Sequence, residues 1–166
     1  MLFRSPASIA ASYSSTITGV LYNATDCALV KAGEIQCTTV AGSGFGPYRW
    51  SVTLGTAPAL PYSPGSWTKL SPTSVATNYH APAITGLAGA AAMATTGNES
   101  VVLQGTNFGP LGTVPSATMG PYRGVQCRLL AAHAGPMVCA TVPGVGVGHT
   151  WTVTVAKLTS GPSAAA

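Results

Sequence analysis

This chain of 166 residues has very few charged side chains. They make up 6% of the sequence, against about 25% in an ordinary globular domain. Its acidic residues are Asp26, Glu34 and Glu99 alone, and its seven basic residues are scattered along the chain. A nucleic-acid-binding surface needs clustered Lys and Arg, so the net charge of +4 does not indicate one.

The scarcity of titratable groups also argues against an enzyme, because acid–base catalysis needs such groups in fixed positions. The three histidines, His80, His133 and His149, have no carboxylate nearby in the sequence. We therefore expect no catalytic residues, no metal site and no cofactor.

Long hydrophobic runs and helical periodicity are missing as well. No apolar run approaches the ~20 residues that a membrane helix needs. Residues 1–10 do not form a signal peptide, because Arg4 and Pro6 interrupt any apolar core. Either a signal has been removed, or the chain is a segment of a longer one.

The composition that remains favours an all-β fold. Disordered chains combine high charge with few apolar residues, whereas 46% of this chain is hydrophobic. Its 20 glycines and 13 prolines are typical of short strands separated by many turns.

Two stretches of the chain are copies of one another. Residues 37–54 align with residues 139–155 across a single one-residue gap. Similarity over this span means that one structural unit is used twice. The second copy has a long N-terminal half that the first copy lacks. The expected domains are therefore a partial sandwich at 1–56 and a complete one at 79–166, with a Pro-, Ser- and Thr-rich linker at 57–78.

Strand-forming composition and, in residues 50–54, alternation of apolar and polar residues predict the strands. The expected strands are 8–22, which is rich in strand-forming residues, the hairpins 27–30 with 35–40 and 126–130 with 137–141, the strand 101–104, and the closing strands 50–54 and 151–155.

The four cysteines fall two per repeat, and equivalent units should close equivalent loops. We therefore expect the disulfides Cys27–Cys37 and Cys127–Cys139, each across a hairpin. Free buried thiols are the alternative. Zinc is disfavoured, because the sequence has no Cys-x-x-Cys motif and no nearby pair of histidines.

Two N-glycosylation sequons begin at Asn23 and Asn98. Together with paired cysteines they indicate a secreted protein in an oxidising environment, and covalent glycans would replace charge as the solubilising groups. The Ser/Thr/Pro-rich linker favours an extended backbone that carries O-linked sugar, although an ordinary flexible linker has the same composition. Candidate modified positions there are Ser63, Pro64, Ser71, Pro72 and Thr73.

The stretch Val101–Gly109, which reads Val-Val-Leu-Gln-Gly-Thr-Asn-Phe-Gly, resembles the opening of an IPT/TIG domain. In that family a strand runs into a Gly-x-Asn-Phe-Gly turn. Paired cysteines, a Pro-Gly-x-Gly loop and a final strand follow, and are similar to Cys127, Cys139 and residues 142–146 and 151–155.

The resemblance covers residues 79–157, with residues 79–84 similar to the family's first strand. The first unit matches only from about 20 to 55, lacks the Gly-x-Asn-Phe-Gly turn, and has Ala41-Gly42 in place of Pro-Gly. The resemblance implies two tandem immunoglobulin-like β-sandwiches of the extracellular branch, the first lacking its N-terminal strands. The basic edge of the DNA-binding branch is not found.

A sandwich without its early strands exposes a sheet edge that invites pairing with another chain. We therefore expect a structural subunit of a glycosylated extracellular filament or surface appendage. In it, copies of the chain assemble head to tail as a helical or linear polymer by β-strand complementation. Residues 8–20 are the favoured donor strand, and the tail after Val155 is the alternative. The second hypothesis is a ligand-binding or adhesion module of a larger cell-surface receptor with tandem IPT/TIG repeats.

Overall fold

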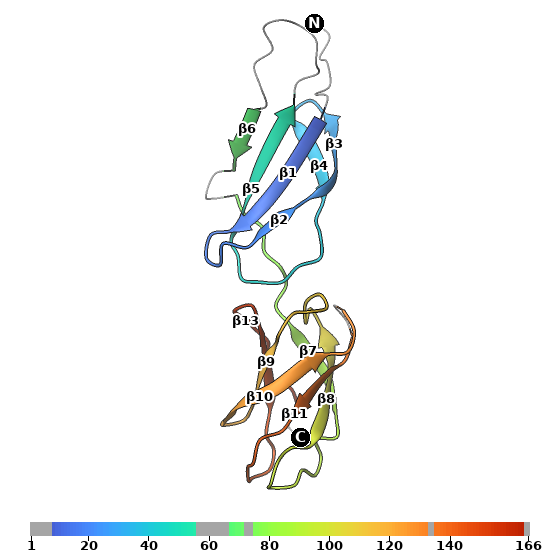
Figure 1. Cartoon of the computed structure of the whole chain (residues 1–166), viewed down its shortest axis with the longest axis vertical. Coiled ribbons are helices and arrows are strands. Elements are labelled where there is room, and N and C mark those ends of the chain that lie inside the picture. The colour runs from blue at the N-terminus through green and yellow to red at the C-terminus, as the bar shows by residue number, and fades with distance from the viewer. Residues whose placement is uncertain (1–7, 56–66, 72–74, 133–134, 165–166) are drawn as a thin grey trace, which may run out of the picture. The chain divides into compact units, whose positions relative to one another are not determined.

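The computed structural model describes residues 8–55, 67–71, 75–132 and 135–164, and its regular secondary structure is entirely β-strand (Figure 1). This confirms the all-β prediction. The described residues include no helix long and apolar enough to cross a membrane. The chain divides into unit 1, which comprises Met1–Val40 and Gly46–Asn78, and unit 2, which comprises Ala41–Phe45 and Tyr79–Ala166.

Unit 1 has six strands in two groups. Four of them form an antiparallel sheet in the order β2-β1-β5-β6, and β3 and β4 form a separate hairpin (Figure 1). The strands are β1 (Ser8–Ser15), β2 (Leu21–Asn23), β3 (Thr25–Lys31), β4 (Glu34–Thr38), β5 (Tyr48–Gly55) and β6 (Trp67–Leu70). β1 is central and pairs with β5 along its whole length.

Unit 2 has seven strands in a single sheet of order β13-β12-β9-β10-β11-β8-β7. The strands are β7 (Ala83–Ala88), β8 (Ser100–Thr106), β9 (Ser116–Met119), β10 (Tyr122–Leu129), β11 (Met137–Ala140), β12 (Trp151–Val155) and β13 (Leu158–Thr159). The long strand β10 pairs with β9 through its first half and with β11 through its second. It therefore joins two halves of the sheet.

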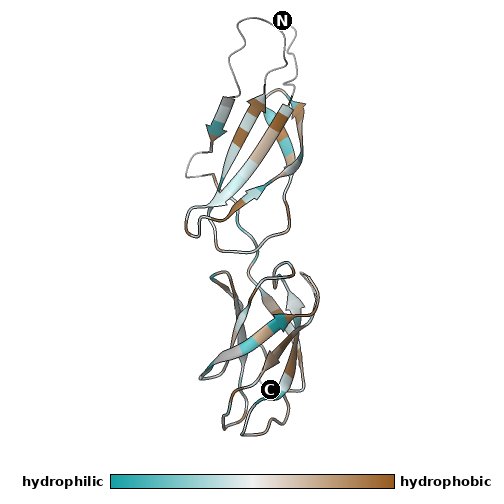
Figure 2. Ribbon diagram, viewed as in Figure 1, coloured by the Kyte–Doolittle hydropathy of each residue, from teal (hydrophilic) through white to brown (hydrophobic). Residues whose placement is uncertain are grey.

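The core of unit 2 follows from strict alternation along its strands. In β12 every second side chain is buried, from Trp151 to Val155, and β8, β9 and β11 show the same pattern. Figure 2 shows hydrophobic positions on the strands of both units. The buried cluster of unit 2 contains Ala90, Val101, Leu103, Phe108, Ala117, Met119, Met137, Cys139, Trp151, Val153 and Val155.

The sheet of unit 1 repeats a half of the sheet of unit 2. Tyr13 of β1 lies opposite Trp50 of β5, and Met119 of β9 lies opposite Trp151 of β12. The order β2-β1-β5-β6 therefore corresponds to β10-β9-β12-β13. The short strands β2 and β3, separated only by Ala24, together take the place of β10.

Each of these two tryptophans exchanges a pair of hydrogen bonds with a serine at an equivalent place. In unit 2 the backbone N–H of Trp151 donates to Ser163 Oγ at 2.9 Å, and the backbone N–H of Ser163 donates to the Trp151 carbonyl at 2.8 Å. Ser71 holds Trp50 in the same way, at 3.1 Å and 2.7 Å. The segment after β6 is therefore the counterpart of the tail after β13.

This finding corrects the linker predicted at 57–78. Residues 67–70 form β6 and pair with β5, and Thr77 forms a bridge to Tyr48, so both belong to unit 1. A Pro- and Ser-rich composition does not prevent a strand when a neighbouring strand supplies the hydrogen-bonding partners. The longer segment of unit 2 begins at Tyr79, which is where the sequence places the second domain, and Ala41–Phe45 also belong to unit 2.

Candidate functional site

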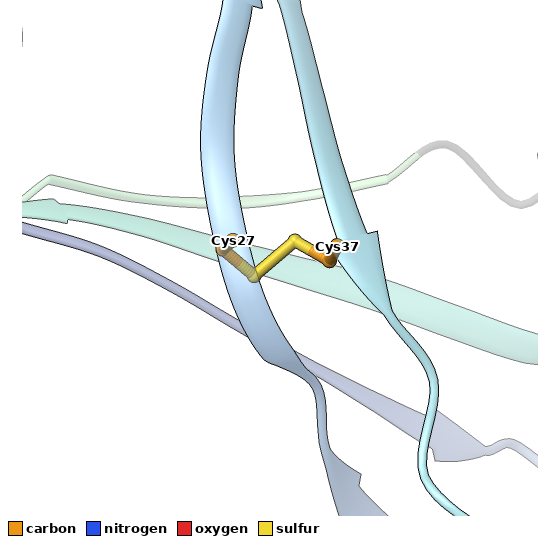
Figure 3. The surroundings of a disulfide bond; sticks show 2 residues. All are labelled: Cys27 and Cys37. Carbon is orange, nitrogen blue, oxygen red and sulfur yellow. A yellow bond between two sulfur atoms is a disulfide. The ribbon is translucent and has the colours of Figure 1, made fainter.

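The hairpin of β3 and β4 is the most distinctive part of unit 1, because it repeats the β10–β11 hairpin of unit 2 but, among the described residues, has no counterpart of β8 on its outer edge. The pair Leu29–Ile35 in unit 1 corresponds to Leu129–Met137 in unit 2. Disulfides bridge equivalent positions, as the sequence predicts: Cys27–Cys37 in unit 1 (Figure 3) and Cys127–Cys139 in unit 2.

The outer edge of β4 pairs with no other strand of the described residues. The Cα atoms of Cys27 and Cys37 are 4.1 Å apart, close to the spacing of a cross-strand pair whose N–H and C=O groups point away from each other, about 4.5 Å. The backbone groups of Cys37, and two residues earlier those of Ile35, therefore face the other side of β4. Within the described part of unit 1, no strand other than β3 pairs with β4.

The same edge is occupied in unit 2. There β8 pairs antiparallel with β11, so that Val101 lies opposite Cys139 and Leu103 lies opposite Met137. β7 then pairs with the far side of β8. The described residues of unit 1 contain no counterpart of β7 or β8, which agrees with the N-terminal half that the first repeat lacks.

The missing strands leave an apolar face uncovered. Leu29 is 39% exposed, whereas Leu129 packs against the core of unit 2. Cys37 and Trp50 are half-buried, whereas their counterparts Cys139 and Trp151 are 0% exposed. Burial of such side chains is what stabilises a sheet on one face, and the described strands of unit 1 bury this face less completely than those of unit 2 do.

β8 and the turn after it supply buried apolar side chains to the core of unit 2. Val101, Leu103 and Phe108 are each 0% exposed. Phe108 folds back beneath β8, and a Cβ atom at Gly105 would collide with its ring and with the Ala83 carbonyl. The turn is held by Asn107, whose side-chain amide donates to the Ala81 carbonyl at 3.1 Å.

An aromatic cluster closes the other half of unit 1. The ring of Tyr13 stacks on Trp50 at 4.7 Å and on Tyr22 at 5.4 Å, and it meets Tyr48 edge-on at 5.8 Å. Burial raises the pKa of Tyr48 to about 12, and the neighbouring hydroxyls of Tyr22 and Tyr13 contribute to this increase. No local sequence pattern indicates this cluster, because its members come from three strands.

Both sequon asparagines lie on the surface. Asn23 is exposed at the end of β2, and Asn98 is exposed just before β8. Asn98 has a φ of 62°, a conformation that asparagine tolerates better than most residues, and its N–H donates to the Thr141 carbonyl.

Of the candidate positions for O-linked sugar or modified proline, only Ser71 lies in the described residues. Its hydroxyl accepts the Trp50 N–H and donates to the Val75 carbonyl at 3.2 Å. The Ser71 hydroxyl therefore links β5 to the segment after β6. The other four, Ser63, Pro64, Pro72 and Thr73, lie outside the described residues.

Two open clefts of unit 2 contain few groups capable of chemistry. One, of about 290 Å³, lies between the alanine-rich loop after β7 and residues 144–149. His149 is its only titratable side chain, and the His149 Nε2 atom lies 3.1 Å from the Val145 carbonyl. The other, of about 440 Å³, is lined beside β7 by residues without titratable side chains.

His80 is exposed and His133 lies outside the described residues. Among the residues that the structure describes, no three His, Cys, Asp or Glu side chains form a group that would hold a metal ion. The candidate functional site is therefore the open face and edge of the β3–β4 hairpin.

Comparisons with known proteins leave this site to be interpreted from its geometry. No protein-family model matches the chain, and searches of curated proteins and of solved structures found no significant match.

Proposed function

We propose that this chain is a structural subunit of an extracellular assembly, a filament or a surface appendage, and that a neighbouring subunit completes unit 1 by adding a β-strand. The observation that supports this proposal is the open β3–β4 hairpin. Its pairing register, disulfide and apolar face repeat those of β10 and β11. Strand addition at an exposed edge satisfies backbone hydrogen bonds and covers the apolar side chains together.

The two donor segments that the sequence suggests are both engaged within the chain. Residues 8–15 form β1, the central strand of the unit 1 sheet, with β2 on one side and β5 on the other. This corrects the prediction that residues 8–20 are a free donor, and removing them would destroy unit 1. The tail after Val155 forms β13, and Ser160 and Ser163 bond to β12.

Several features support an extracellular location and an immunoglobulin-like IPT/TIG fold. Two disulfides fit an oxidising compartment, and both sequon asparagines are accessible. The last three residues of the Gly-x-Asn-Phe-Gly segment, 107–109, directly follow β8, and this supports the proposal. Intact-mass measurement before and after removal of N-glycans should show sugar at Asn23 and Asn98. A mass equal to that of the 16.5 kDa polypeptide would contradict the glycan proposal.

The second candidate is a module of a larger receptor or adhesin with tandem repeats. The repeated register of the two units favours it. In that case the strands that complete unit 1 belong to an upstream part of the same polypeptide.

Sedimentation and electron microscopy of the chain recovered from extracellular material of its natural source distinguish the two candidates. The assembly proposal predicts particles or filaments much larger than one chain, from which mild denaturant releases the subunit. A monomeric, longer polypeptide whose own upstream segment covers β4 would support the receptor candidate instead.

A matched pair of variants localises the contact. Leu29→Lys places a charge on the face that the added strand would cover, and Ala28→Lys places it on the opposite face of the same strand. Both positions are exposed in the isolated chain, so both variants should fold. Loss of incorporation for Leu29→Lys alone is expected, and equal incorporation of the two would refute assembly through this face.

A further inference from the structure

The structure assigns a sequence pattern and a pairing register to the strand that completes unit 1. This assignment rests on the proposed function and uses unit 2 as its template. We infer that the completing strand resembles β8, binds antiparallel to β4, and belongs to a different polypeptide.

The register follows from the equivalence of the two hairpins. Val101 lies opposite Cys139, and Leu103 lies opposite Met137. Cys37 and Ile35 occupy those two positions in unit 1. The incoming strand therefore places one apolar residue opposite Cys37 and a second, two residues later, opposite Ile35. Its intervening side chain points away from the core, because successive side chains of a strand alternate.

The rest of the pattern comes from the turn after β8. Gly105 is needed because the ring of Phe108 and the Ala83 carbonyl occupy the space of its side chain. Phe108 follows three residues later and is fully buried. The predicted donor reads apolar-x-apolar-x-Gly-x-x-Phe. In unit 2 Phe108 and Trp151 belong to one buried cluster. The donor's aromatic ring would therefore extend the core of unit 1, in which Trp50 is half-buried although Trp151 is fully buried.

A second copy of this chain is an unsuitable donor. In its described residues the pattern occurs in β8, which is already paired on both edges, with β7 and with β11. Moving β8 into a neighbour's unit 1 would fill one unit and empty another, so the buried apolar area would not increase. Because no uncommitted strand with this pattern occurs among the residues that the structure describes, we assign the completing strand to a different polypeptide.

The test uses a synthetic peptide with the sequence of residues 100–109, added to the full oxidised chain. Amide hydrogen exchange is followed by mass spectrometry in β4 and, as an internal reference, in β11. The peptide should slow exchange in β4 at least ~tenfold at saturation, because local opening must then break new hydrogen bonds. Exchange in β11 should not change. A peptide carrying Val101→Asp and Leu103→Asp should leave β4 unprotected.

The variants test the face and the register. Leu29→Lys should weaken peptide binding ~tenfold or more, since it requires burial of a charge, and Ala28→Lys should change it by less than about twofold. No protection of β4, or equal protection by both peptides, would overturn the assignment.

The source of the strand is tested with the chain alone. If the chain self-associates and the amides of β8 then lose their protection from hydrogen exchange, the assignment to a different polypeptide is overturned, while the proposal that the chain is an assembly subunit is supported. Peptide binding to β4 by a chain whose native form is not assembled would retain the assigned register and refute the proposed function. The two proposals can therefore fail separately.

Discussion

Equivalent valines of the two units provide a direct measure of how incomplete unit 1 is. Val153 of β12 is 0% exposed, and Val52 of β5, at the same place in the repeat, is half-buried. Removing two buried carbons costs about 0.8 kcal/mol each, and the remaining cavity increases the total to about 2–3 kcal/mol. Val153→Ala should therefore destabilise unit 2 by that amount.

Val52→Ala should cost unit 1 under about 1 kcal/mol, because the side chain is already partly hydrated and no closed cavity forms. Hydrogen exchange of peptides from β5 and β12 measures each unit separately. The expected increase in exchange is ~30-fold or more for Val153→Ala and less than about fivefold for Val52→Ala. When the β8 peptide is bound, the loss of stability caused by Val52→Ala should approach the loss caused by Val153→Ala. Equal costs without the peptide would show that the core of unit 1 is already closed.

Three further perturbations follow from individual contacts. Replacing Cys127 and Cys139 by Ala should destabilise unit 2 by about 3 kcal/mol, since the bond closes a short loop, and chemical denaturation should show a lower midpoint; an unchanged midpoint would mean that the bond adds no stability. Ser163→Ala removes the acceptor of the buried backbone N–H of Trp151 and should destabilise unit 2 by about 1–3 kcal/mol. Ser71→Ala should destabilise unit 1 by less, because its bond to the backbone N–H of Trp50 is only partly buried; a larger loss in unit 1 than in unit 2 would contradict this reasoning. Because the pKa of Tyr48 is raised to about 12, its contribution to stability is complete below pH 10 and is lost as pH rises from 10 to 12. Tyr48→Phe should remove that part of the alkaline loss, and an unchanged pH profile of unfolding would refute it.

Local sequence patterns predict the elements whose residues carry their own signal. The alternation of Trp151 to Val155 predicts β12 with the observed bounds, and the cysteine spacing within the repeat predicts both hairpins. The sequence does not reveal β6 or β9. Residues 67–70 lie among Pro, Ser and Thr, and Ser-Ala-Thr-Met at 116–119 has little β-branched character, so both strands depend on a distant partner.

The candidate site was only partly predictable for the same reason. The sequence shows that the first repeat lacks a half, and this predicts an open edge. It does not show which edge, because that depends on the register Leu29–Ile35 and on the direction of the Cys37 backbone. Nor does it show that β1 is committed to the central position of its sheet.

The aromatic cluster explains how one half of unit 1 remains ordered while the other half is open. Tyr13 takes the place of Met119, and Tyr48 takes the place of His149, in otherwise equivalent strands. Larger rings bury more apolar area from one sheet alone, and Tyr13 and Tyr48 are 2% and 1% exposed. The half that contains β1, β2 and β5 therefore builds a core from its own side chains. The open half, with Leu29, has no such substitution and retains the small aliphatic face that a strand with the pattern of β8 would fit.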